Sequence, residues 1–90
     1  MVREARRYVV SGRVQRVGFR FFVEAAGIRA GLVGWVRNLP DGTVEIVAQG
    51  DEGDLQSFER QVRQGPPGAR VSSVDVTVVP LADFAGFDIR

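Results

Sequence analysis

The segment with the clearest chemical potential runs Gly12-Arg13-Val14-Gln15-Arg16-Val17-Gly18-Phe19-Arg20, where two glycines bracket a short loop. A β-branched run precedes the loop, and a helical pattern of apolar residues follows it. A loop that enters a helix N-terminus gathers several backbone N–H groups in front of the positive end of the helix dipole. Such N–H groups form a concave nest for an anion. The segment therefore predicts an anion site. It is not a Walker A loop, because no Gly-Lys-Ser/Thr sequence follows, and its glycine spacing does not fit a dinucleotide fingerprint.

Arg20 adds a cation to this segment, in the first turn of the expected helix. A positive side chain at that position opposes the helix dipole and is slightly unfavourable unless a negative group compensates it. The compensating group is either a bound anion or the carboxylate of Glu24, one turn later. Both interpretations are open from the residues alone.

Asn38 is the only asparagine in the chain, and it stands before the turn sequence Leu39-Pro40-Asp41-Gly42. An amide side chain can donate to one oxygen and accept a proton from a water molecule at the same time. The alternative is a structural asparagine, which is common next to Pro and Asp-Gly.

Three reactive residue types, Cys, His and Lys, do not occur in the sequence. A thiolate nucleophile, a histidine base and a lysine of the P-loop or Schiff-base kind are therefore excluded. The acidic residues show no spacing typical of metal ligands. We expect no metal and no cofactor, and chemistry that relies on arginine, hydroxyls, carboxylates or amides.

The charge balance is 12 basic against 11 acidic residues, a net charge of +1. A net charge this small does not indicate that the domain as a whole binds nucleic acid. The first 20 residues nevertheless contain a single acid, Glu4, and six arginines, namely Arg3, Arg6, Arg7, Arg13, Arg16 and Arg20. This local charge favours an anionic partner, the alternative being arginines that are simply solvated.

The elements that position these residues follow from periodicity and turn signals. We expect strands over 7–14, 33–38, 43–49 and 74–78, a terminal edge strand within 84–90, and helices over 19–30 and from 51 to Gly65. This order predicts an α+β, ferredoxin-like split βαβ (βαββαβ) sandwich, with two helices on one face of an antiparallel sheet. A crossover through a helix makes the strands over 7–14 and 33–38 parallel, so the loop and Asn38 meet at one sheet edge.

A chain of 90 residues with 44% hydrophobic residues predicts one folded domain over 1–90. The longest apolar runs, such as Phe21-Phe22-Val23, are too short to span a bilayer, and the first residues contain no signal-peptide h-region. We expect a cytoplasmic monomer without a membrane or nucleic-acid partner.

Two motifs at the right separation resemble the acylphosphatase family. The first is the segment from Gly12 to Arg20, and the second is Gly34-Trp35-Val36-Arg37-Asn38 with Asp41-Gly42-Thr43-Val44-Glu45 after it. The ending Phe87-Asp88-Ile89-Arg90 is also similar to that of the family. The resemblance implies metal-independent hydrolysis of an acyl phosphate to a carboxylate and inorganic phosphate.

The resemblance also assigns roles to residues. The family's phosphate-binding arginine falls on Arg20, its water-positioning asparagine on Asn38, and its phosphate-binding loop amides on Gln15, Arg16, Val17, Gly18 and Phe19. One position departs from the pattern, because the signature most often has glycine where this chain has Arg16. If that residue needs a positive φ, Arg16 carries strain of about 1 kcal/mol. Otherwise it only adds positive charge beside the anion.

Two alternatives remain at this point. A phosphate-binding module on the same fold, including a detached domain of a larger maturation protein, would bind the anion without turnover. An RNA-binding domain of similar topology would stack bases on aromatic residues of the open sheet face. The strand over 43–49 contains no aromatic residue, and Tyr8 and Trp35 are the only candidates for such stacking.

Overall fold

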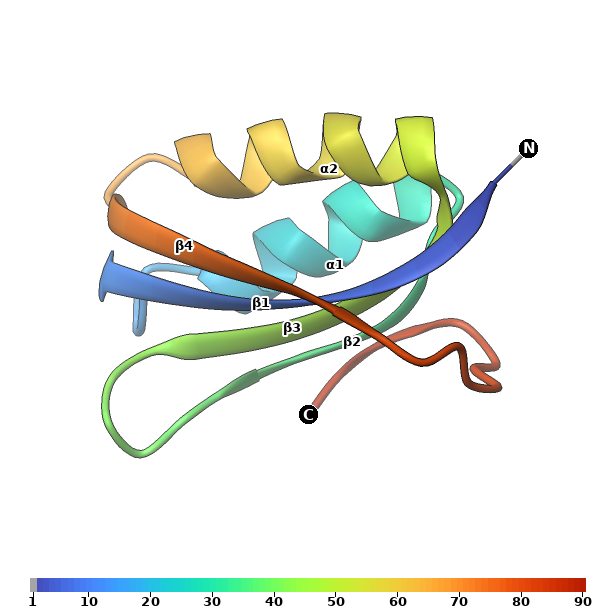
Figure 1. Ribbon diagram of the computed structural model, residues 1–90. Coiled ribbons are helices and arrows are strands. Elements are labelled where there is room, and N and C mark those ends of the chain that lie inside the picture. Colours follow the sequence, from blue (N-terminus) through green and yellow to red (C-terminus); the bar gives the residue numbers. More distant parts are fainter. Residues whose placement is uncertain (1) are drawn as a thin grey trace.

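The computed structural model describes residues 2–90 and has the element order predicted from the sequence (Figure 1). The elements are β1 (Arg3–Arg13), α1 (Phe19–Arg29), β2 (Val33–Asn38), β3 (Val44–Asp51), α2 (Glu52–Gln64), β4 (Arg70–Val79) and β5 (Phe87–Ile89). The strands form one sheet in the order β4-β1-β3-β2-β5, and both helices cover the same face of it (Figure 1). The predicted α+β ferredoxin-like class is confirmed.

The terminal strand β5 gives the sheet its one parallel pair, with Gly34 opposite Phe87 and Val36 opposite Ile89. β4 is antiparallel to β1, so it ends at the edge of the sheet where β1 and β2 begin. Residues 80–86 then carry the chain past β3, where the backbone of Ala82 bonds to the Gln49 side chain, to the outer side of β2. β5 therefore runs in the direction of β2, and the sheet is mixed rather than wholly antiparallel.

β1 begins at Arg3, four residues before the predicted start. Most residues at this end of the strand are charged, so the alternation of apolar and polar residues that indicates a strand is not visible there. The strand continues there because it lies inside the sheet and pairs with β3 and β4 on its two sides, from Ala5 onward on both. Backbone pairing on both sides outweighs the weak β-propensity of these residues.

The core lies between the sheet and the two helices, as the apolar patterns predict. α1, of 11 residues, buries Phe19, Val23, Ala26 and Gly27, and α2, of 13 residues, buries Leu55, Phe58 and Val62. They pack on a layer of strand residues, Tyr8, Val10, Val36, Val44, Ile46 and Ala48. Within residues 2–90, no helix is long and apolar enough to cross a membrane.

Gly27, in the middle of α1, allows the helix to approach β5 closely. A Cβ at this position would lie 2.6 Å from two ring atoms of Phe87. The sequence predicts such a close approach as compensation for a mid-helix glycine, which costs about 1 kcal/mol relative to alanine. The contact fixes α1 against the edge of the sheet.

The two aromatic residues that a base-stacking function would need are both covered. Tyr8 is fully buried beneath α2, where its ring meets Phe58 edge-on. Trp35 lies on the sheet face opposite the helices, and the guanidinium groups of Arg37 and Arg90 lie 5.1 and 4.7 Å from its ring centroid. The structure therefore gives the RNA-binding alternative no free stacking surface on these two residues.

Candidate active site

The loop between β1 and α1 ends at Gly18, which is the N-cap of α1 and has a φ of 76°. A glycine provides no side chain to cap the helix, and the first turn contains no acidic residue. The first N–H groups of an α-helix have no partner within the helix. Those of α1 are therefore available to an anion in front of the helix.

Arg16 lies in the same loop with a φ of 63°, and it is the one non-glycine residue with positive φ between residues 2 and 90. The left-handed conformation costs a non-glycine L-residue about 1–2 kcal/mol, because its Cβ comes too close to the following carbonyl oxygen. The positive φ of Arg16 is a conformation that glycine adopts more easily, and glycine is the residue that the family signature most often has at this position. Its exposed side chain also adds a positive charge beside the helix N-terminus.

Gln15 ties the loop to the connection between β2 and β3. Its side-chain Nε2 donates to the carbonyl oxygens of Leu39 and Thr43, at 2.9 and 3.0 Å. The sequence analysis assigned Gln15 a role only through its backbone amide and missed this contact. The only signal for it was the long amide side chain within a loop that ends at the same sheet edge as the turn.

The turn after β2 is held by hydrogen bonds of its own. The Asp41 carboxylate accepts from the hydroxyl of Thr43 at 2.6 Å and from its backbone N–H at 3.0 Å. These two bonds hold the pKa of Asp41 below its ordinary value, and the bond from the hydroxyl contributes more than the bond from the backbone N–H. The turn that follows Asn38 is thereby held in one conformation.

A pocket of about 140 Å³ opens where the loop, the start of α1 and the end of β2 meet. Its lining residues are Val14, Arg16, Gly18, Phe19, Arg20, Phe21 and Asn38. The structure therefore brings together five of the seven predicted site residues. The side chain of Gln15 bonds to the neighbouring turn and that of Val17 packs against the core, and neither contact involves the backbone amides predicted to bind phosphate. Val14 and Phe21 line the pocket without having been predicted.

The two predicted side chains of this pocket have different surroundings. The Oδ1 atom of Asn38 is buried and has no hydrogen-bond partner among the described residues. The Nη1 atom of Arg20 donates to the carbonyl of Arg90 at 3.3 Å, and no ion pair joins Arg20 to Glu24 in the described chain. Neither structural alternative, a turn-forming Asn38 or an Arg20–Glu24 pair, matches these contacts.

A basic pocket in front of a helix N-terminus, with one buried acceptor, can bind an oxyanion and a water molecule together. No group of three or more His, Cys, Asp and Glu side chains in residues 2–90 is arranged to hold a metal ion. The model of the family described as acylphosphatase matches residues 6–89.

The chain belongs to the acylphosphatase family.

Relatives in this family align over most of both chains. An acylphosphatase of Koribacter versatilis is 51% identical over 88 residues, which cover 97% of this chain and 80% of that protein. An acylphosphatase of Acaryochloris marina is 48% identical over 81 residues, 90% of this chain and 87% of the other. The crystal structure of acylphosphatase from Bacillus subtilis superposes with a TM-score of 0.94 at 42% identity and covers 99% of each chain. The chain is an acylphosphatase, and its substrates are acyl phosphates.

Proposed function

We propose that the backbone amides of residues 15–19 and the guanidinium of Arg20 hold the transferred phosphoryl group, and that Asn38 positions the attacking water. The observation that carries this proposal is the buried Oδ1 of Asn38, which has no partner in the described chain and lies in the same pocket as Arg20. A buried acceptor without a hydrogen bond costs about 1–3 kcal/mol. A water molecule in the pocket that donates to this Oδ1 would remove that cost, and the hydrogen bond would orient the water.

Phosphate binding rests on the positive potential at the start of α1. The loop amides and the helix dipole act on charge that spreads over three phosphoryl oxygens during transfer. A guanidinium group adds a planar fork that can donate to two of those oxygens at once. The volume of about 140 Å³ equals that of about four or five water molecules in the liquid. It suits one phosphoryl group with one water.

The reaction step balances without any other protein group. The water oxygen forms a bond to phosphorus, while the bond from phosphorus to the bridging acyl oxygen breaks. The electron pair of that bond leaves with the carboxylate, and the water proton passes to a phosphate oxygen. Asn38, at the end of β2, contributes by holding the water in line, which makes the attack effectively unimolecular.

The leaving group explains why the chain can act without histidine, cysteine or lysine. A carboxylic acid has a pKa of about 4 and leaves as an anion at neutral pH, so no general acid is needed. Arg20 and the loop amides supply fixed positive charge where negative charge develops. For this reason we propose a metal-independent reaction.

The test is phosphate release from a synthetic acyl phosphate, measured with and without EDTA. We expect the same rate in both, and competitive inhibition by inorganic phosphate. Activity that EDTA abolishes and Mg²⁺ restores would overturn the metal-independent mechanism. Phosphate binding without phosphate release would identify a binding module instead.

The pocket bears on how many chains the chemistry requires. All residues that line the pocket come from one chain, so a second copy is not required for its chemistry. We propose a single catalytic domain over 1–90 that acts as a monomer in the cytoplasm.

A further inference from the structure

Phe21 is the most exposed of the large hydrophobic side chains in the described chain, with 68% of its surface accessible. The others are Val2, Ile28, Val76, Val78 and Leu81, and none of these lies in the pocket of the site. Single exposed apolar residues are common. An exposed phenylalanine on the wall of a catalytic pocket is different, because its apolar surface is next to the place where substrate binds.

The start of α1 directs Phe21 toward the pocket. Phe21 is the third residue of the helix, and side chains on an α-helix lean toward its N-terminus. That end carries the N–H groups assigned to the phosphate. Phe19 is buried, Phe22 packs against the core, and the centroids of these two rings are 6.3 Å apart. The core therefore uses the neighbouring rings and leaves Phe21 at the mouth.

The size of the pocket indicates what Phe21 meets. Once a phosphoryl group and a water molecule occupy the pocket of about 140 Å³, a large acyl group on the bridging oxygen no longer fits inside and must extend through the mouth. Of the other side chains that line the pocket, Arg16, Arg20 and Asn38 are polar, and the apolar Val14 and Phe19 are buried. Ala25, one turn further along α1, is also exposed and continues the apolar surface from Phe21.

We infer that Phe21 contacts the acyl group and gives this enzyme a preference for acyl phosphates whose acyl group is large and apolar. The inference rests on the proposed position of the phosphate. An aromatic ring at the mouth removes apolar acyl surface from water in both the bound and the transition state. A small acyl group such as acetyl is too short to gain from that contact.

The experiment compares benzoyl phosphate with acetyl phosphate in the full chain. Phe21→Ala is expected to lower kcat/KM for benzoyl phosphate about tenfold, the effect of losing roughly 50 Å² of apolar contact. It leaves kcat/KM for acetyl phosphate within about twofold and inhibition by inorganic phosphate unchanged. Phe21→Leu keeps an apolar side chain and is expected to lie between the two.

Ile28→Ala is the matched control, because it truncates an equally exposed apolar residue of the same helix outside the pocket. It is expected to change neither substrate. An equal loss on both substrates in Phe21→Ala, with intact phosphate inhibition, would overturn the inference and leave the phosphate site standing. Normal phosphate inhibition in Arg20→Ala would instead show that the proposed site is misplaced. A selectivity loss of the same size in Ile28→Ala would also overturn the role of Phe21.

Discussion

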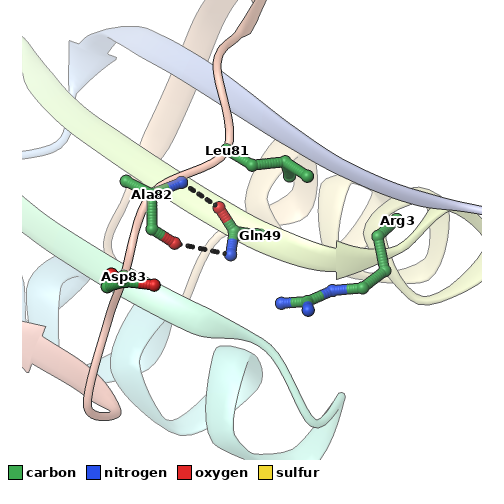
Figure 2. A pocket seen from close by; sticks show the side chains of 5 residues that line it. All are labelled: Arg3, Gln49, Leu81, Ala82 and Asp83. Atoms are coloured by element: carbon green, nitrogen blue, oxygen red, sulfur yellow. Dashed lines mark hydrogen bonds between the residues drawn. The ribbon is translucent and has the colours of Figure 1, made fainter.

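Two pockets at opposite ends of the sheet differ in how they use a buried amide side chain. The larger, about 330 Å³, lies at the start of β1 and is lined by Arg3, Gln49, Leu81, Ala82 and Asp83 (Figure 2). There Nε2 of Gln49 donates to the Ala82 carbonyl and Oε1 accepts from the Ala82 N–H, both at 2.9 Å (Figure 2). The smaller pocket contains Asn38, whose buried Oδ1 has no partner in residues 2–90.

The difference teaches that volume alone does not mark a functional site. The amide of Gln49 has both ends bonded, and it holds the segment before β5 against the sheet. The amide of Asn38 keeps an acceptor without a partner in a place where native proteins rarely leave one. The smaller pocket also has the strained Arg16 and an uncapped helix start, whereas the larger has no residue of positive φ in its lining. Of the two buried atoms that have no partner within residues 2–90, the Tyr8 hydroxyl is enclosed in the core, whereas Oδ1 of Asn38 lies at a pocket that also contains the strained Arg16.

The largest expected effect is at Arg20. Arg20→Ala is expected to lower turnover by about 10³–10⁵, the range for arginines that stabilise a transferred phosphoryl group, and to remove inhibition by inorganic phosphate. The fold is retained, because the side chain is half-buried and makes one hydrogen bond to a backbone carbonyl. Steady-state kinetics with a melting curve measure both.

Two variants sharpen this result. Arg20→Lys keeps the charge without the planar fork and is expected to restore little activity. Arg3→Ala removes an arginine from the larger pocket and is expected to leave turnover unchanged. An equal loss of turnover in the Arg3 variant would mean that general positive charge, and not the position of Arg20, drives the reaction.

The next effect in size is at Asn38. Asn38→Ala is expected to lower kcat by about 10²–10³, the cost of losing one aligned polar group, with phosphate inhibition nearly unchanged. Its side chain contacts the nucleophile rather than the bound anion in the proposed arrangement. The measurement pairs kcat with the inhibition constant of inorganic phosphate, at a temperature where the variant is folded.

Gln49→Ala is the control in the other pocket. It leaves the backbone groups of Ala82 without partners and is expected to cost about 1–3 kcal/mol of stability without changing kcat. A lower melting temperature with normal kcat in Asn38→Ala would make Asn38 equivalent to Gln49. The water would then be positioned by some other group.

The sequence was sufficient to predict that Arg20 and Asn38 meet. A helix that crosses over between β1 and β2 makes these strands parallel, so the loop after β1 and Asn38 at the end of β2 had to share a sheet edge. The apolar faces of α1 and α2 followed from periodicity in the same way. These predictions depend on local pattern and on rules of topology, which a single sequence contains.

The contacts that the sequence did not reveal are made between side chains and distant backbone. Nothing in the pattern around Gln15 indicates which carbonyls it bonds 24 and 28 residues away. Phe21 looked like part of an apolar run, Phe21-Phe22-Val23, and only the packed structure shows which ring the core leaves out. The parallel pairing of β5 likewise depended on the path of residues 80–86 from β4 past β3 to the opposite edge of the sheet, which no periodicity describes.

The smallest expected effect is at Arg16, where strain and charge can be separated. Arg16→Gly relieves the left-handed conformation and is expected to raise stability by about 1 kcal/mol, or to raise Tm by roughly 4–8 °C. It also removes a charge at the rim of the pocket, which is expected to weaken phosphate inhibition about two- to threefold at low salt and less at high salt. Arg16→Ala removes the same charge and keeps the strain, so it is expected to weaken inhibition equally without gaining stability. Thermal melts and phosphate inhibition of both variants measure the two effects independently. Equal stability of the two variants would show that the loop carries no strain at Arg16, and the contrast with the larger pocket would then rest on Asn38 and the uncapped start of α1.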